Sequence, residues 1–234
     1  MKKLQILFSA FCFLLPTLRA QEMQQITVWK NGNVIYNSNL SVTDSLIFSS
    51  INFPNSSDGV LINGVTWATC NVDMPGTFAS QPNEAGMFYQ WNRNIGWSSK
   101  DPMVNSNGGT VWDPSIPAGN SWEAANNPCP TGWRLPTSAE HQSLIDSGSF
   151  WDEMNGVAGR FFGSGTQIVF FPAAGCRYDN SGLLTDVGFI GSYWSGEPST
   201  NYDAAYTLFF YNIGVNTFYG DSRSFGFSVR CVSE

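Results

Sequence analysis

Side chains able to carry catalysis are scarce in this chain. Of 234 residues, one is a histidine. His141 lies one turn into a predicted helix, where we expect a surface or half-buried position. Asp152 and Glu153 fall in a predicted polar turn, where adjacent carboxylates diverge and water solvates both. No nucleophile elbow, P-loop or dinucleotide fingerprint is present. The sequence predicts a protein that is not an enzyme, with no catalytic residue and no cofactor.

Two short segments carry groups suited to a cation or a sugar. Gln81-Pro82-Asn83 and Glu197-Pro198-Ser199 are faintly similar to the Glu-Pro-Asn type of motif that binds Ca²⁺ and sugar hydroxyls. Neither is accompanied by a Trp-Asn-Asp triplet. No two cysteines of the exported chain have the spacing of a zinc ligand pair, and no histidine cluster adds to them. The sequence therefore predicts no metal site, and calcium binding at one of the two Pro-containing segments is the alternative.

The first 20 residues have the layout of a secretory signal peptide. Lys2 and Lys3 precede a mostly apolar run over residues 4–15, and cleavage is expected after Ala20. The run is shorter than the roughly 20 residues that span a bilayer. Lipid modification at Cys12 is disfavoured by the short apolar run before it. We expect an exported chain, extracellular or at the outer cell surface, with no transmembrane segment after cleavage.

Composition agrees with an exported, β-rich protein. Charged residues make up 12% of the chain and aromatic residues 15%, while 23 glycines and 12 prolines predict many turns. Eleven basic residues face 18 acidic ones, for a net charge of −7. Loss of the leader removes three basic residues and makes the chain more acidic. Nucleic acid is therefore excluded as a partner.

Four cysteines remain after the leader: Cys70, Cys129, Cys176 and Cys231. In an oxidising compartment they predict two disulfides, with three possible connectivities. One pair of free buried thiols is the alternative, because a core of this size does not require covalent bridges.

The chain divides into a leader (1–20), an N-terminal β appendage with linker (21–57) and one larger domain (58–234). In the appendage, β-prone runs flank Asn31-Gly32 over residues 26–36, which predicts a hairpin. Residues 46–48 predict a further strand, and residues 49–59 a linker. This appendage is too small for a core of its own, and strand donation to a neighbour is an alternative role.

In the larger domain the pattern predicts few helices and many short strands. Asn63-Gly64 predicts a hairpin between residues 60–62 and 65–67. A short helix is expected over residues 83–91, and a longer one after Pro136, where Thr137 and Glu140 form a capping-box pattern. Further strands are predicted over residues 158–162, 167–171, 188–194, 204–211 and 225–232. The predicted fold class is α+β.

Several motifs resemble a known family. They read Val-Thr-Trp-Ala at 65–68, Cys-Pro-Thr-Gly-Trp-Arg-Leu-Pro-Thr at 129–137, Pro-Ala-Ala-Gly-Cys-Arg at 172–177, Gly-Ser-Tyr-Trp-Ser at 191–195 and Gly-Phe-Ser-Val-Arg-Cys-Val at 226–232. In this order they resemble the Fibrobacter succinogenes major paralogous domain, common in exported proteins of Bacteroidota. The N-terminal appendage, with Asp-Ser-Leu-Ile-Phe at 44–48, looks like short leader segments on surface proteins of the same bacteria. The resemblance covers about residues 59–234 and implies a C-type-lectin-like fold.

That fold carries further expectations. Its N- and C-terminal strands pair, and the resemblance implies a disulfide between Cys129 and Cys231, which leaves Cys70 and Cys176 as a second pair. Large aromatic side chains bury most of their area, so we expect Trp67, Trp133 and Trp194 in the core. Arg134 and Arg230 are expected to bond carbonyl or carboxylate oxygens.

The C-terminal region carries the predicted binding surface. Eleven of the 36 residues from Ser192 to Phe227 are aromatic, and they alternate with Asn, Ser, Thr, Asp and Gly. Tyr mixed with Ser, Asn and Gly is typical of binding surfaces; an ordinary aromatic-rich β surface is the alternative. The predicted ligand-binding residues are Asn201, Tyr202, Asp203, Tyr206, Tyr211, Asn212, Asn216, Phe218, Tyr219, Asp221, Ser222 and Ser224.

This region resembles the variable segment of proteins diversified by diversity-generating retroelements, which use the same fold for display. The resemblance implies a surface-displayed, adhesin-like protein that binds a protein or glycan, with a surface or pilus assembly as a further expected partner. The alternatives are a carbohydrate-binding lectin of fixed specificity, a structural surface protein without a ligand, and an enzyme related to formylglycine-generating proteins, which would need a reactive cysteine pair.

Overall fold

The structure is a computed structural model, which describes residues 5–6, 25–30, 33–39, 59–201 and 203–234. The chain forms two compact units, Met1–Ser50 and Ile51–Glu234. In the first, β1 (Gln5–Ile6), β2 (Gln25–Lys30) and β3 (Asn33–Asn39) form an antiparallel sheet in that order. The pairing of β2 with β3 confirms the hairpin. The strand expected at 46–48, the linker up to residue 58 and most of the leader lie outside the described residues.

In the second unit, a four-stranded sheet joins segments far apart in sequence. Its order is β4 (Val60–Ile62), β5 (Val65–Trp67), β17 (Val232–Ser233) and β8 (Trp133–Arg134). Asn63 and Gly64 adopt φ angles of 47° and 84°, the left-handed conformation of a tight hairpin turn. Val232 pairs with Trp67 on one side and with Arg134 on the other. The expected pairing of N- and C-terminal strands is confirmed.

Helix α1 (Ser138–Asp146) begins where its capping box predicts. Thr137 Oγ1 accepts from the Glu140 backbone N–H at 3.1 Å, and a Glu140 carboxylate oxygen accepts from the Thr137 N–H at 2.7 Å. Arg134 donates to both oxygens of the same carboxylate at 2.8 and 2.6 Å. The helix ends before Gly148, which has a φ of 88°.

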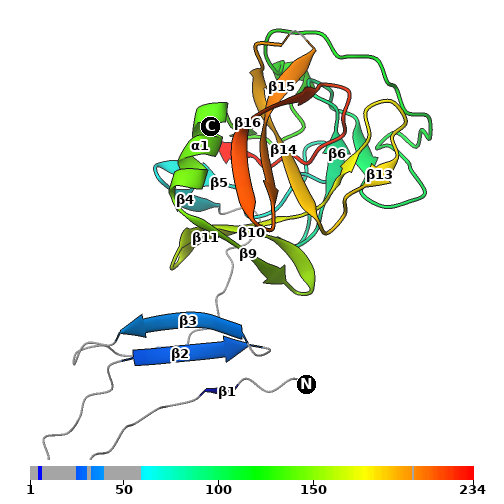
Figure 1. Cartoon of the computed structure of the whole chain (residues 1–234). Coiled ribbons are helices and arrows are strands. Elements are labelled where there is room, and N and C mark those ends of the chain that lie inside the picture. The colour runs from blue at the N-terminus through cyan, green and yellow to red at the C-terminus, as the bar shows by residue number, and fades with distance from the viewer. Residues whose placement is uncertain (1–4, 7–24, 31–32, 40–58, 202) are drawn as a thin grey trace, which may run out of the picture. The chain divides into compact units, whose positions relative to one another are not determined.

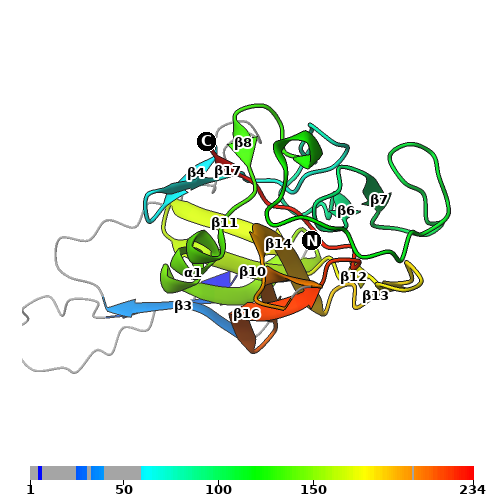
Figure 2. The ribbon, with the colours of Figure 1, turned by 90° about the horizontal axis from the view of Figure 1, so that it is seen from above.

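Two three-stranded antiparallel sheets form most of the rest (Figures 1 and 2). One has the order β11 (Gln167–Pro172), β10 (Val157–Ser164), β9 (Ser149–Met154), and the other β14 (Ile190–Pro198), β15 (Ala204–Tyr211), β16 (Gly214–Ser222). The shorter elements are β6 (Met87–Tyr89), β7 (Gly96–Ser98), β12 (Cys176–Arg177), β13 (Leu184–Thr185) and a 3₁₀ turn at Ala124–Asn126. Antiparallel strands with one α-helix are consistent with the α+β class.

Four predicted strands are confirmed: those expected at 158–162, 167–171, 188–194 and 204–211 are β10, β11, β14 and β15. Each observed strand begins within two residues of its predicted start. The helix expected over residues 83–91 is wrong. Gly86 has a φ of 66°, which breaks a helix, and the Met87 N–H bonds the Val72 carbonyl at 3.0 Å to start β6.

Two other expectations need correction. The polar turn containing Asp152 and Glu153 is strand β9, which turns into β10 at Asn155-Gly156 with φ angles of 52° and 81°. The strand expected over residues 225–232 is mostly irregular. It crosses the interior and pairs only locally, as Phe227 does with Tyr89, before β17 begins at Val232.

The core contains two clusters on opposite faces of β14. Tyr193 packs into one with Trp67 and Phe210, and the next residue, Trp194, packs into the other with Phe227. This is the alternation expected of a strand buried on both faces. Trp67 and Trp194 are fully buried, as predicted. Trp133 is partly buried, with its ring edge-on to Phe78.

Arg230 is fully buried among these clusters. Its guanidinium donates to the carbonyl oxygens of Ala68, Thr69 and Phe170 at 3.0, 2.6 and 3.0 Å, and to Asn71 Oδ1 at 2.9 Å. It also lies 4.4 Å from the ring centroid of Phe171. The prediction that Arg230 and Arg134 bond carbonyl and carboxylate oxygens is confirmed. One side chain thereby joins the N-terminal part of the unit, strand β11 and the last segment of the chain.

Arg230→Met should lower the free energy of unfolding by about 3–5 kcal/mol, because it leaves several buried acceptors without a donor. Urea denaturation followed by tryptophan fluorescence measures this. Lys100→Ala, at an exposed position, should change it by less than about 0.5 kcal/mol. A loss below 1 kcal/mol for Arg230→Met would contradict the role assigned to this residue.

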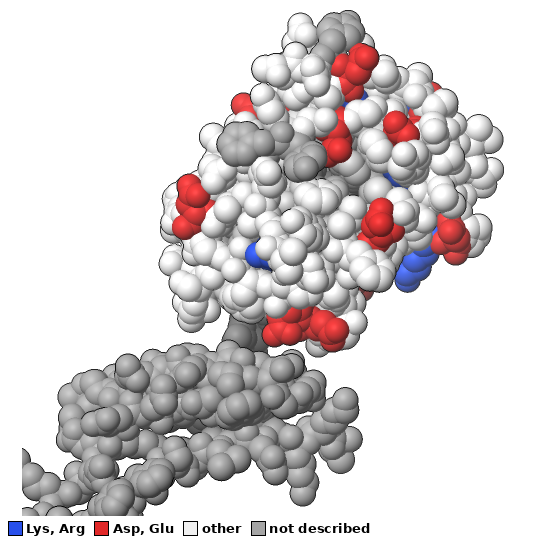
Figure 3. All heavy atoms as spheres, viewed as in Figure 1, with Lys and Arg blue, Asp and Glu red and all other residues white. Residues whose placement is uncertain are grey.

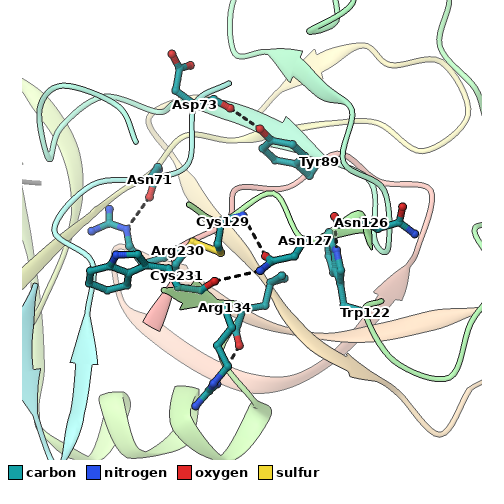
Figure 4. Close-up of a disulfide and its surroundings, with 12 residues drawn as sticks. Asn71, Asp73, Tyr89, Trp122, Asn126, Asn127, Cys129, Arg134, Arg230 and Cys231 are labelled. Atoms are coloured by element: carbon teal, nitrogen blue, oxygen red, sulfur yellow. Dashed lines mark hydrogen bonds between the residues drawn. A yellow bond between two sulfur atoms is a disulfide. The ribbon is translucent and has the colours of Figure 1, made fainter. Parts of the chain in front are cut away.

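The disulfide between Cys129 and Cys231 is present, as the resemblance implies (Figure 4). It links residues 102 positions apart, just before α1 and in the last segment of the chain. The second expected pair is wrong, because Cys70 and Cys176 are separate buried thiols. Burial raises the pKa of both, that of Cys176 to about 12. Both thiols therefore stay protonated inside the core.

Cys129→Ala combined with Cys231→Ala should destabilise the protein by about 5 kcal/mol, the loop-closure value for about 100 residues. Chemical denaturation measures the loss. Alkylation and peptide mapping of the unsubstituted protein provide a separate check. Cys70 and Cys176 should react only after unfolding, and a peptide that joins these two cysteines would disprove the assignment.

Candidate functional site

The hairpin of β15 and β16 carries most of the predicted binding residues but does not gather them on one face. Asn201, Asp203, Tyr211 and Asn212 are exposed, Tyr206, Asn216, Asp221 and Ser222 are half-buried, and Ser224 is buried. Tyr202 lies outside the described residues, and for Phe218 and Tyr219 the backbone in β16 is described but not the side chain. The exposed members occupy opposite ends of the hairpin.

Strand alternation explains this division. In β15, Leu208 and Phe210 point into the core on one face, while Phe209 and Tyr211 lie on the other. Helix α1 lies beside the hairpin (Figure 1), where Thr217 Oγ1 donates to Gln142 Oε1 at 2.9 Å. The two faces of the hairpin therefore have different surroundings, and the predicted residues cannot act as one surface.

At one end, six residues form what we call the tip surface: Ile190, Phe209, Tyr211, Asn212, Ile213 and Asn216. Ile190 pairs with Tyr211, and Phe209 pairs with Asn216. The rings of Phe209 and Tyr211 are 6.0 Å apart. Tyr211 is 40% exposed and Ile213 82% exposed. Aromatic, aliphatic and amide groups are thus presented together to solvent.

The tip surface has a rigid support. Arg160 of β10 is buried and donates to the carbonyl oxygen of Tyr211 at 3.0 Å and to Ser149 Oγ at 2.9 Å. This ties the end of β15 to the sheet of β9, β10 and β11. Ile190, Phe209 and Ile213 are not among the predicted binding residues. The available sequence signal was an isoleucine between Asn212 and Gly214, where a turn is expected and an apolar residue has no packing role.

The opposite end of the hairpin contains Asn201, Asp203, Asp221 and Ser222, with a largely structural set of contacts. Asp221 accepts from Thr207 Oγ1 at 3.1 Å, and burial raises the pKa of its carboxyl group. The Asp203 carbonyl oxygen accepts from the Arg223 N–H at 3.0 Å.

Ser224 requires a correction, because it is 3% exposed and its hydroxyl bonds Ser222 Oγ at 2.9 Å. Its carbonyl oxygen also accepts from the buried amide of Gln90 at 3.0 Å. Ser224 therefore supports the loop after β16 and is not placed to touch a ligand.

A cleft in the second unit is lined by none of the predicted binding residues. It is an open cleft of about 860 Å³, lined among others by Asn83, Glu84, Lys100, Glu153, Ala158 and Ala174. Its walls come from the segment between β5 and β6, the end of β7 and the residues after it, the β9–β10 hairpin, the end of β11 and the residues after it, and the segment between β13 and β14. No sequence motif marks this cleft, because its lining residues come from segments that are widely separated in the chain.

The two segments with faint similarity to a calcium motif have separate roles. Asn83 lines the cleft, whereas Glu197 accepts from the backbone N–H and hydroxyl of Ser138 at 2.8 and 2.5 Å and so caps helix α1. Among the described residues, no three His, Cys, Asp or Glu side chains lie close enough together to hold a metal ion. Within the same part of the chain, no helix has the length and apolar character needed to cross a membrane.

Comparison of the chain with family models, curated proteins and solved structures found no match. The family resemblance accordingly rests on the sequence motifs quoted above.

His141 corrects the expectation of a surface or half-buried helical residue. It is 1% exposed and stacks on Trp67 with ring centroids 5.8 Å apart. Its two ring nitrogens have no hydrogen-bond partner in the described part of the chain. Burial lowers its pKa to about 3, so the folded protein holds a neutral imidazole.

Between about pH 3 and 6.5 the unfolded chain binds a proton at His141 and the folded chain does not. The free energy of unfolding is therefore independent of His141 above about pH 6.5. Below that pH it falls by about 1.4 kcal/mol per pH unit, down to about pH 3. Urea denaturation at pH 6.5 and pH 5 should differ by about 2 kcal/mol. His141→Met should reduce this difference sharply; an unchanged difference in the variant would assign it to other groups.

Proposed function

We propose that this chain is an exported, surface-displayed ligand-binding protein, adhesin-like in role, which binds through the tip surface. The carrying observation is the exposure of Tyr211, Asn212 and Ile213 beside Phe209 on a hairpin braced by a buried arginine. Exposed apolar groups gathered on a rigid framework are typical of interaction surfaces. Rigid aromatic side chains add contact area at a low entropic cost.

The proposed scaffold is a C-type-lectin-like domain similar to the Fibrobacter succinogenes major paralogous domain. Three features support it: the pairing of β5 with the C-terminal strand β17, the disulfide from the segment before α1 to the last segment, and long irregular loops between short strands. In this scaffold a hairpin near the C-terminus displays variable side chains while the core stays constant, which is the role we assign to β15 and β16.

The chemistry of the tip surface favours a protein as its ligand. Ile190, Phe209 and Ile213 provide aliphatic and aromatic area, whereas glycan sites depend on ring stacking combined with several fixed polar groups. Tyr211 and Asn212 add hydrogen-bonding groups beside this apolar area. Export with a cleaved leader, retention at the cell surface and entry into a pilus assembly belong to the same proposal.

The proposal includes no catalytic role. The chemistry of formylglycine-generating proteins needs a reactive cysteine pair, and thiolate is the reactive form. Here Cys70 and Cys176 are buried, and their raised pKa values keep them protonated. The third group with catalytic potential, His141, is enclosed by the core.

Tyr211→Ala combined with Ile213→Ser should reduce binding to the natural target at least tenfold, because it removes the apolar centre of the tip surface. Adhesion of fluorescent beads coated with the protein to cells of the same microbial community measures this. A glycan array probed with and without chelator tests the lectin alternative.

Phe150→Ala is the matched control, since Phe150 is an aromatic residue 49% exposed on β9, outside the tip surface. The double variant and the Phe150→Ala control should both unfold thermally within a few degrees of the unsubstituted protein. Equal loss of adhesion in the control, or retention of adhesion in the tip variant, would refute the proposed surface.

A further inference from the structure

We propose that the cleft beside the β9–β10 hairpin is a second binding site, which takes a short extended peptide bearing basic side chains. Its volume of about 860 Å³ lies within the range of small-ligand sites, roughly 300–1,000 Å³. It is lined by different residues from the tip surface, so the inference is independent of the proposed function.

The charges around the cleft set the sign of its ligand. Asp73, Glu84 and Glu153 line it against one basic residue, Lys100. The ion pairs within the described residues are Arg93–Asp113, Arg134–Glu140 and Arg177–Asp101, so none of the four charged groups at the cleft is neutralised by a partner there. On the face shown in Figure 3, acidic side chains also outnumber basic ones, in keeping with the net negative charge of the chain. A cationic ligand is favoured.

The carboxylates serve a ligand larger than a metal ion. Asp73 and Glu84 both come from the long segment between β5 and β6, and Glu153 comes from the end of β9. They do not converge as a three-ligand metal site within the described chain. Glu84 is already held by the backbone N–H of Ser80 at 2.9 Å, which fixes its position in the wall. Separate carboxylates suit a ligand with more than one cationic group.

The floor of the cleft suits a peptide better than a sugar. It is made of small residues, among them Ala158, Ala173 and Ala174, over which a peptide backbone can lie closely. None of the described lining residues is aromatic, so the ring stacking on which sugar binding commonly depends has no platform here.

The test uses the full exported chain and a blocked, fluorescent peptide of sequence Ala-Lys-Ala-Lys-Ala, titrated by anisotropy at low salt. We expect saturable binding that weakens as salt is added. Asp73→Asn combined with Glu153→Gln should raise Kd at least tenfold. Ala158→Leu, which keeps all charges but fills part of the cleft, should also raise it several-fold.

Glu123→Gln is the matched control, because Glu123 is exposed and does not line the cleft. It should change Kd less than twofold. The inference is overturned if the peptide shows no saturable binding, if Ala-Glu-Ala-Glu-Ala binds as well, or if Glu123→Gln weakens binding as much as the cleft variants. It is also overturned if Ala158→Leu, with its thermal unfolding unchanged, leaves Kd at the parent value.

Discussion

The buried guanidinium of Arg230 is the interaction on which the rest of the domain depends. Its donors reach carbonyl oxygens in the segment after β5 and in β11, and it lies in the same irregular segment that carries Cys231. A guanidinium offers five N–H donors in a fixed plane, so it can satisfy acceptors from several backbone segments at once. An irregular segment can cross the interior here because the Arg230 side chain donates hydrogen bonds to the backbone carbonyl groups beside it, a role that strand pairing has within a sheet.

Three further buried arginines repeat this device around the domain. Arg177 bonds the carbonyl oxygens of Ser98, Lys100 and Gly182; Arg223 bonds those of Ala204 and Gly119 and lies 4.3 Å from the Trp91 ring centroid. Arg160 holds the end of β15. With few helices and short strands, long loops need fixed partners, and arginine supplies them. The chain has few basic residues, and much of its arginine serves the interior, which leaves the surface acidic.

Local signals predicted local structure well. The capping box of Thr137 and Glu140 placed the start of α1, and Asn63-Gly64 placed a hairpin, because both motifs act within a few residues. The Asn155-Gly156 signal was equally clear, but the charged pair before it favoured a polar turn. Residues 83–91 were mistaken for a helix because Met87, Phe88 and Trp91 have helical spacing, while the close approach of Gly86 to Val72 depends on tertiary structure.

The candidate site was less predictable than the fold. Composition identified the β15–β16 hairpin, yet the face of each residue depends on register, including the irregularity between Thr207 and Phe209. The cysteine count could not show whether Cys70 and Cys176 form a disulfide or stay as free thiols. That depends on whether the fold brings the two side chains together, and here it buries them separately. The cleft could not be predicted because five segments distant in sequence build it, and none of them carries a recognisable motif.

The place of β17 within its sheet has a consequence for the timing of folding. Val232 pairs with Trp67 on one side and Arg134 on the other, so one of the last residues of the chain lies between strands that are synthesised much earlier. While the chain is still emerging, β5 and β8 have a gap between them that nothing else fills. The sheet can therefore close only after β17 has been synthesised, long after β5 and β8. Its completion depends on contacts between segments that are distant in sequence, which makes it a late step relative to the local hairpins.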